Sequence, residues 1–151
     1  MIKQGTKKDI IDMVICAKEF EKESGVFKKT GGIDVDYFTT LLNTLFDNNI
    51  LKCWLITKDD MIVGGIGLLE VEDLFSGIKC LNELFWFVKK EYRGSIENIR
   101  LFKKMETYAK NNDVKYIQMI HLPDLKEVKL EKLYIKKGYS LLQKCYIKEV
   151  R

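Results

Sequence analysis

Apolar residues in the first fifty positions follow helical spacing after a short strand-like start. Residues 1–5 predict a first strand, and residues 7–24 carry apolar side chains at every third or fourth position. Thr6 is placed to cap this helix, and Gly25 is placed to end it. Asp34 is expected to cap a second amphipathic helix, which the Asp-Asn-Asn run at 47–49 ends.

The middle of the chain changes to strand-like runs. Residues 51–57, 61–71 and 80–88 are rich in apolar and β-branched side chains and indicate three strands. Lys-Asp-Asp at 58–60 predicts a hairpin turn between the first two. Three glycines in the second run favour a β-bulge or a close approach of another backbone, and they are Gly64, Gly65 and Gly67.

The last third predicts a strand–helix–strand crossover. Residues 100–111 indicate a helix, 115–120 a short buried strand, and 127–137 a last helix ended by Gly138; residues 140–150 favour one or two closing strands. The order β-αα-β-β-β-α-β-α-β(β) predicts an α/β (α+β) fold. We expect a mixed, mostly antiparallel central sheet of six to seven strands, with about four helices on its two faces.

Composition places the chain among ordinary globular proteins and predicts one domain spanning residues 1–151. Hydrophobic residues make up 46% and charged residues 32% of the sequence. No apolar run reaches the ~18–20 residues that cross a bilayer, and the N-terminal residues do not resemble a secretory signal. The four scattered cysteines and single histidine give little support to a zinc site, so we expect no metal and a cytoplasmic location.

Charge is divided unevenly along the sequence. Residues 1–88 carry 10 Lys/Arg and 14 Asp/Glu, a net charge of −4, whereas residues 89–151 carry 16 and 8, a net charge of +8. A basic second half favours an anionic ligand such as a phosphate. A lysine-rich solvated surface explains the same numbers equally well.

Three stretches carry a resemblance to a known family. Residues 82–95 read NELFWFVKKEYRGS, residues 134–139 read YIKKGY, and residues 143–148 read QKCYIK. The first resembles the fourth strand and the cofactor loop of GNAT acetyltransferases. The second is similar to the Tyr motif near the C-terminus of that family, and the third to the final strand of its phage-encoded members. With the order of elements, the resemblance covers essentially the whole chain, and it implies acetyl-CoA as co-substrate.

The resemblance assigns a coenzyme A site to the strand end and the loop after it. In the family, backbone N–H groups between this strand and the next helix bind the pyrophosphate, and the strand end pairs with the pantetheine arm. The residues that match are Phe87, Val88, Arg93, Gly94, Ser95, Ile96, Glu97 and Asn98. Ile96 and Asn98 stand where the family motif has glycine. Arg93 could instead be an exposed loop residue, and Ser95 a simple helix cap.

Two side chains match the family's proton-transfer positions. Glu83, on an apolar strand, corresponds to the general base of several members, and Tyr134 to the general acid near the coenzyme sulfur. The alternatives are a buried structural carboxylate for Glu83 and a packed helix residue for Tyr134. His121, after the short strand, is more often structural at such a place than a proton carrier.

These patterns favour an acetyl-CoA-dependent N-acetyltransferase, an acyl-CoA N-acyltransferase acting on a primary amine. The acidic first half suits a cationic acceptor, which the sequence does not identify. A catalytically inactive GNAT-fold binding protein is the alternative, favoured by the glycine-poor loop. A nucleic-acid-binding module ranks last, because no basic stripe interleaved with exposed aromatics is evident. The oligomeric state stays open, a homodimer included.

Overall fold

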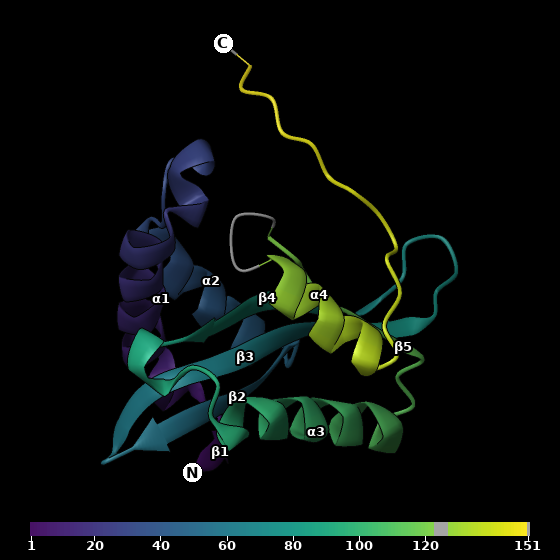
Figure 1. Cartoon of the computed structure of the whole chain (residues 1–151), viewed down its shortest axis with the longest axis horizontal. Coiled ribbons are helices and arrows are strands. Elements are labelled where there is room, and N and C mark those ends of the chain that lie inside the picture. Colours follow the sequence, from purple (N-terminus) through teal and green to yellow (C-terminus); the bar gives the residue numbers. More distant parts are fainter. Residues whose placement is uncertain (123–126, 151) are drawn as a thin grey trace.

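The computed structural model describes residues 1–122 and 127–150. Its regular elements follow the predicted order, and Figure 1 shows them along the chain. They are β1 (Ile2–Gln4), α1 (Ile10–Ser24), α2 (Val35–Asp47), β2 (Leu51–Lys58), β3 (Met61–Glu72), β4 (Lys79–Val88), α3 (Ile96–Asn111), β5 (Tyr116–Gln118) and α4 (Glu127–Lys136). Short 3₁₀ turns stand at Lys7–Asp9, Val26–Thr30 and Lys90–Tyr92.

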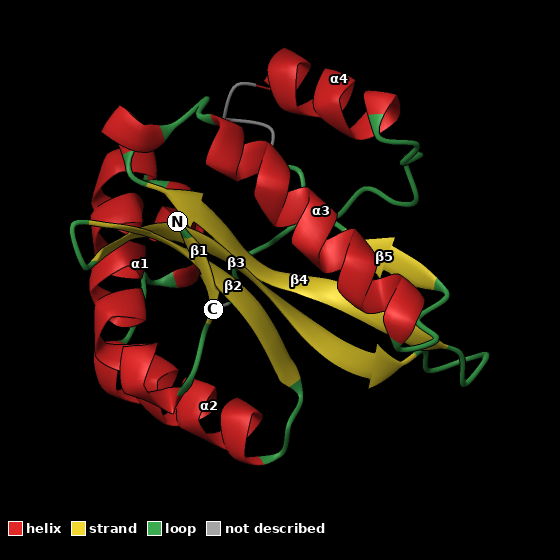
Figure 2. Cartoon of the chain, turned by 90° about the horizontal axis from the view of Figure 1, so that it is seen from below, coloured by secondary structure: helices red, strands yellow, loops and turns green. Residues whose placement is uncertain are grey.

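The strands form one mixed sheet in the order β1-β2-β3-β4-β5. The first three pairs are antiparallel, and β4 and β5 are parallel neighbours joined by α3. This arrangement confirms the mostly antiparallel sheet and the crossover predicted from the sequence. Helices α1 and α2 lie on one face, and α3 and α4 on the other (Figure 2).

The predicted sheet was too large at its C-terminal end. The described residues form five strands instead of six to seven, and residues 140–150 are extended but belong to no strand. Their side chains are exposed and make no backbone pairing within the described chain. An alternating apolar pattern indicates strand propensity, but a strand forms only against a partner edge.

Local signals in the sequence explain where most elements begin and end. Gly25 ends α1 with a φ of 64°, in the left-handed region where glycine avoids a steric penalty. The Asp34 side chain accepts a 2.8 Å hydrogen bond from the Tyr37 N–H and so caps α2. Asp59 and Asp60 both have positive φ, as a tight hairpin requires. After Thr6 the chain first makes the 3₁₀ turn, and α1 begins only at residue 10.

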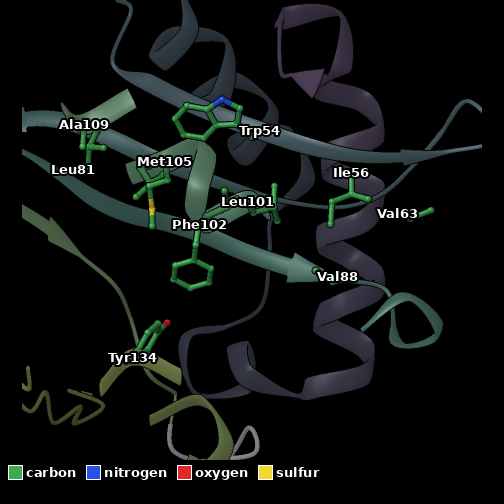
Figure 3. Packing of buried hydrophobic residues seen from close by; sticks show 12 residues of the cluster. Trp54, Ile56, Val63, Leu81, Val88, Leu101, Phe102, Met105, Ala109 and Tyr134 are labelled. Carbon is green, nitrogen blue, oxygen red and sulfur yellow. The ribbon is translucent and has the colours of Figure 1, made fainter. Parts of the chain in front are cut away.

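Two hydrophobic clusters sit on the two faces of the sheet. The cluster under α3 and α4 contains Phe102 and Met105, neither of which has any exposed surface, and Figure 3 shows Phe102 pointing toward Tyr134. The cluster under α1 and α2 contains Met13 and Leu42. Burial on both faces fixes the orientation of β4, which carries most of the candidate site.

Helix α3 is longer at its start than the pattern of apolar positions predicts. It begins at Ile96 instead of residue 100, with Ser95 as the N-cap residue. The segment matched to the family's cofactor loop therefore includes the first turn of a helix. The N–H groups of Ile96 and Glu97 have no partner inside the helix and can bind an anion, whereas the Asn98 N–H donates to the Ser95 carbonyl.

Candidate active site

The site lies where β4 and β5 separate. Their parallel ladder ends with the pair Asn82 and Gln118, and β4 continues for six more residues to Val88. Along those six residues the edge of β4 that faced β5 is no longer paired with it. A strand edge with free main-chain groups can bind an extended ligand by backbone hydrogen bonds.

A β-bulge in β4 directs side chains toward this gap. Leu68 pairs with Glu83 and Gly67 with Phe85, so one extra residue, Leu84, is accommodated in β4. Leu84 and Phe85 then both pack in the α1/α2 cluster, while Trp86 packs in the α3/α4 cluster. The predicted irregularity at the glycines is confirmed, because a Cβ on Gly67 would lie 2.3 Å from the Phe85 ring.

Glu83 is a half-buried residue whose carboxyl has one hydrogen-bond donor. Its Oε2 accepts a 2.9 Å bond from the N–H of Ile120, in the segment that follows β5. Burial raises the pKa of Glu83 to about 7, although the hydrogen bond from Ile120 opposes the rise. No Lys or Arg among the described residues forms an ion pair with it, so near neutral pH the carboxyl can both take and release a proton.

Tyr134, on α4, also binds Ile120, from the other side of the gap. Its hydroxyl donates a 3.0 Å hydrogen bond to the carbonyl oxygen of Ile120. Burial, followed by the negative charges of Glu83 and Tyr139, raises the pKa of Tyr134 above its ordinary value. The phenol therefore stays protonated and can act as a proton donor.

Three buried polar atoms beside the gap have no hydrogen-bond partner. They are Asn82 Oδ1 and Trp86 Nε1 on β4 and His121 Nε2 after β5. The His121 ring also lies 6.4 Å from the Tyr134 ring in an edge-on contact. Because buried polar atoms are nearly always paired in folded proteins, these orphans fit a site that a polar ligand or water completes.

The loop after β4 leads directly into α3. Gly94 has a φ of 76°, which explains why glycine occupies this turn. The Asn98 amide donates to the carbonyl of Tyr92 and to the hydroxyl of Ser95, both at 3.1 Å. Ser95 occupies the N-cap position, but its side chain makes no capping hydrogen bond. These hydrogen bonds hold the loop in place, and the N–H groups of Ile96 and Glu97 at the start of α3 stay available.

Arg93 is bound by an acidic side chain of α1. Its guanidinium makes two parallel hydrogen bonds to Glu23, at 2.6 and 2.7 Å, and a third of 2.8 Å from Nε to the carbonyl of Val88. It also lies over the ring of Phe20. Arg93 is therefore neither a free loop residue nor, in this state, directed at a phosphate.

Two cavities border the loop, on different sides. A cavity of about 300 Å³ lies between α1 and the end of β4 and is lined by Phe87, Val88 and Arg93 among others. A larger one of about 470 Å³ lies by the β2–β3 turn and includes Ser95 and Glu97. Neither cavity is lined by Glu83 or Tyr134, so the candidate proton-transfer groups lie outside both.

The two bulky residues at the start of α3 are Ile96 and Glu97. Ile96 is largely exposed, and Glu97 forms a 3.7 Å ion pair with Arg100 one turn along the helix. Glu97 also lines the larger cavity, toward the β2–β3 turn. Its carboxylate is thus partly neutralised, and an anion at the helix N-terminus meets less repulsion than the sequence alone indicates.

Sequence comparisons find no matching family model and no matching curated protein. Structure comparison, by contrast, matches the entire chain. A possible acetyltransferase from Clostridium difficile 630 aligns with a TM-score of 0.75 at 18% identity, covering 100% of this chain and 97% of that one. A predicted acetyltransferase with acetyl-CoA from Clostridium acetobutylicum aligns with a TM-score of 0.77 at 14% identity, covering 99% and 95%. An aminoglycoside acetyltransferase from an uncultured soil metagenomic sample aligns with a TM-score of 0.75 at 15% identity, covering 100% and 98%.

These similarities establish the fold. The protein has the GNAT fold, as the resemblance of its motifs implied. No cluster of three or more His, Cys, Asp or Glu in residues 1–122 and 127–150 could hold a metal ion. No helix in the same ranges has the length and apolar character needed to span a membrane.

Two contributors to the site were missed by the sequence reasoning. Ile120 acts through its peptide groups, which accept from one candidate side chain and donate to the other. Glu23 lies 70 positions before its partner Arg93. A main-chain contact leaves no trace in residue type, and a long-range ion pair has no characteristic spacing.

Proposed function

We propose that this protein transfers the acetyl group of acetyl-CoA to a primary amine. The observation that carries the proposal is the meeting of Glu83 and Tyr134 at Ile120, beside the gap between β4 and β5. Glu83 has a pKa of about 7, in the range that suits a general base near neutral pH, and the raised pKa of Tyr134 keeps its hydroxyl protonated, as a proton donor requires. The GNAT fold of the chain, which it shares with the matched acetyltransferases, supports this chemistry.

The residues divide the proton transfers between them. Glu83, directly or through one water, takes a proton from the incoming ammonium, so that the amine nitrogen can bond to the thioester carbonyl carbon. Tyr134 gives its hydroxyl proton to the sulfur as the carbon–sulfur bond breaks. The nitrogen gives up a second proton to solvent as the carbon–sulfur bond breaks. The products are an amide, free coenzyme A and one proton released to solvent, and the proton gained by Glu83 returns to Tyr134 through solvent. Both side chains must leave or share their bonds to Ile120 during turnover.

The co-substrate has a suitable place on the chain. The edge of β4 beyond its pairing with β5, at Phe87 and Val88, can pair with the amide groups of the pantetheine arm once Arg93 releases the Val88 carbonyl. The turn at Gly94 and the first turn of α3 offer backbone N–H groups to the pyrophosphate. The basic second half of the chain, with a net charge of +8, favours the remaining phosphate.

The charge of α1 supports a cationic acceptor. Glu19 and Glu23 of α1 lie beside the end of β4. Glu19 pairs with Lys89, and Glu23 pairs with Arg93, next to the smaller cavity. An acceptor ammonium that enters here meets carboxylates whose present partners are partly exposed and can exchange. An aminoglycoside, a polyamine or a lysine side chain carries such charges.

A second candidate function is ligand binding without catalysis. Ile96 and Asn98 replace two glycines of the family motif, and Arg93 is occupied by Glu23. These features weaken the phosphate site while leaving the fold intact. A protein of this kind would bind the anion or the amine but would not release coenzyme A.

One experiment separates the two candidates. Release of the coenzyme A thiol is followed after acetyl-CoA is added with a panel of aminoglycosides, polyamines and lysine peptides, for the natural sequence and for Glu83→Gln. We expect amine-dependent thiol release that the variant loses. If acetyl-CoA raises the melting temperature but no amine produces thiol release, the binding function replaces the enzymatic one.

A further inference from the structure

Trp86 carries a buried hydrogen-bond donor that nothing in the described chain uses. Its Nε1 has no solvent contact and no acceptor within residues 1–122 and 127–150. An indole N–H can only donate, and when it is buried in a folded protein it usually finds an acceptor. Phenylalanine at this position would offer an apolar ring without desolvating a donor. A ligand therefore explains the N–H group of Trp86 better than packing does.

Trp86 lies on the part of β4 that has separated from β5. The ladder between these strands ends at Asn82, four residues earlier. On the other side of β4, Trp86 pairs with Ile66 and Glu83 pairs with Leu68 of β3. Ile66 and Leu68 both belong to the α3/α4 cluster, and directly opposed residues of an antiparallel pair point to the same face. Trp86 and Glu83 therefore share the α3/α4 face of β4.

Two aromatic rings hold the indole in place. The Trp86 ring meets the Phe102 ring of α3 edge-on, with 5.1 Å between the centroids and 84° between the planes. Its centroid also lies 6.4 Å from that of the Tyr134 ring of α4, toward which Phe102 points (Figure 3). A donor fixed in this way needs little reorganisation when a ligand arrives. The indole is thus a neighbour of the side chain proposed to protonate the leaving sulfur.

The chemistry beside Tyr134 supplies an acceptor for this donor. In the proposed function, on which this inference rests, the Tyr134 hydroxyl gives its proton to the sulfur of acetyl-CoA. The carbonyl oxygen of the thioester is bonded to the same carbon as that sulfur. When the amine nitrogen bonds to this carbon, the π electron pair of the carbonyl moves onto the oxygen, which becomes an oxyanion. The oxygen therefore becomes a stronger acceptor during the reaction than it is in free acetyl-CoA.

We propose that the indole N–H of Trp86 donates a hydrogen bond to the carbonyl oxygen of the acetyl group and stabilises the oxyanion formed from it. The bond forms with bound acetyl-CoA and strengthens as negative charge develops, so it lowers the barrier more than it adds affinity. When the carbon–sulfur bond breaks, its electron pair leaves with the sulfur, and the extra pair on the oxygen restores the carbonyl. Trp86 keeps its proton in every step.

The first test observes the hydrogen bond by NMR. Trp54 and Trp86 are the only tryptophans in the sequence, so nitrogen-15-labelled protein gives two indole N–H signals, which Trp54→Phe and Trp86→Phe assign. We expect saturating acetyl-CoA to move the Trp86 proton signal downfield, whereas coenzyme A, which has no acetyl carbonyl, leaves it in place. Equal shifts with both ligands would assign the donor to another part of the coenzyme. That result, or bound acetyl-CoA without a shift, overturns the proposal.

The second test measures what the hydrogen bond does for the rate. Trp86 is replaced by 3-benzothienylalanine, in which sulfur takes the place of the N–H group and the ring keeps its size. We expect kcat for thiol release to fall by about 10²- to 10³-fold, with the dissociation constant of acetyl-CoA nearly unchanged. The matched control is the same replacement at Trp54, which is buried in the same cluster and packs on Tyr108. A rate that falls equally at both positions, or at neither, contradicts the proposal.

The two tests together separate a failure of this inference from a failure of the proposed enzyme. If amines produce thiol release from acetyl-CoA but the Trp86 signal does not move, the enzyme stands and the role of Trp86 is overturned. If acetyl-CoA changes neither the melting temperature nor either indole signal, the coenzyme site is wrong, and the role of Trp86 is overturned with it.

Discussion

The two regions proposed to bind acetyl-CoA differ in how far their side chains are preorganised. One is the proton-transfer site at the β4–β5 gap, and the other is the phosphate site at the loop before α3. At the gap between β4 and β5, Tyr134 is buried and Glu83 is half-buried; both bind Ile120, and both have raised pKa values. At the loop before α3, Arg93 is bound to Glu23, and the first helical turn carries Ile96 and the acidic Glu97. The proton-transfer groups are already in place, whereas Arg93 must release Glu23 before it can bind a phosphate.

This difference indicates that the rate of the chemical step and the affinity for acetyl-CoA depend on different regions. Preorganised groups lower the barrier for the chemical step, while a site that must first break an ion pair binds more weakly. We therefore expect substitutions near Ile120 to affect turnover and substitutions near Arg93 to affect the dissociation constant for acetyl-CoA.

The largest effect is expected for Glu83→Gln. The amide keeps the shape of the side chain and can accept from Ile120, but it cannot take a proton. Turnover with a competent amine should fall by about 10²- to 10⁴-fold, as the loss of a general base predicts. The loss should shrink as pH rises, because more of the acceptor is already neutral; kcat measured from pH 6 to 9 checks this. A loss independent of pH would assign Glu83 a structural role.

Tyr134→Phe should lower turnover through a different step. The ring and its packing stay, but the proton for the leaving sulfur is missing, so kcat should fall by about 10²-fold or more while the dissociation constant of acetyl-CoA changes little. The carbonyl of Ile120 also loses its donor, which should lower stability by about 0.5–1.5 kcal/mol. Full turnover in this variant would remove Tyr134 from the mechanism.

The buried carboxyl should also make stability depend on pH. Below about pH 4.5 Glu83 is protonated in the folded and unfolded states alike, and as pH rises toward 7 only the unfolded chain ionises it. Folding stability from this group is therefore lost between these two values, by about 3 kcal/mol. Glu83→Gln should cancel that loss, which denaturant unfolding at pH 4 and pH 8 can measure. Equal pH dependence in both proteins would contradict the burial of an ionisable group here.

A smaller effect is expected for Glu23→Gln. If Arg93 turns to the pyrophosphate, removing its competitor should tighten acetyl-CoA binding by about 2- to 5-fold, the scale of a partly exposed ion pair. Calorimetric titration with acetyl-CoA measures the change. The control is Glu19→Gln, which removes the neighbouring ion pair between Glu19 and Lys89 and leaves Arg93 with Glu23. An unchanged dissociation constant together with a lower melting temperature would show that Arg93 only fastens α1 to β4.

The smallest effect is expected for Glu97→Gln. The carboxylate pairs with Arg100 and lines the cavity beside the β2–β3 turn, so it should repel a phosphate weakly. We expect the acetyl-CoA dissociation constant to change by no more than about twofold at physiological salt. A much larger gain in affinity in the same titration would place Glu97 against the bound phosphates.

The sequence predicted the fold well because its signals are local. Helix caps such as Asp34 and Gly25, the turn at 58–60 and the glycines of β3 act through nearby backbone, and the structure has each of them where the pattern put it. The closing strands were wrong because strand propensity in residues 140–150 says nothing about whether an edge is in reach.

The candidate site was only partly predictable, for the same physical reason. Residue type and motif gave Glu83, Tyr134 and the loop at Arg93, but the shared contact at Ile120 is a main-chain interaction. The pairing of Arg93 with Glu23 joins two elements that are distant in sequence. Both depend on tertiary packing, which a single sequence does not encode by spacing.

The protonation of Glu83 is the central quantity, and it can be measured without knowing the acceptor. The side-chain carboxyl carbon is labelled and titrated by NMR from pH 3 to 10, with Glu83→Gln used to assign its signal. A midpoint near pH 7 is the expected result, because a desolvated carboxyl beside the β4–β5 gap resists ionisation. A midpoint near 4.5, the ordinary value for glutamate, would mean that water or an unseen partner solvates Glu83, and its role as the base would fail.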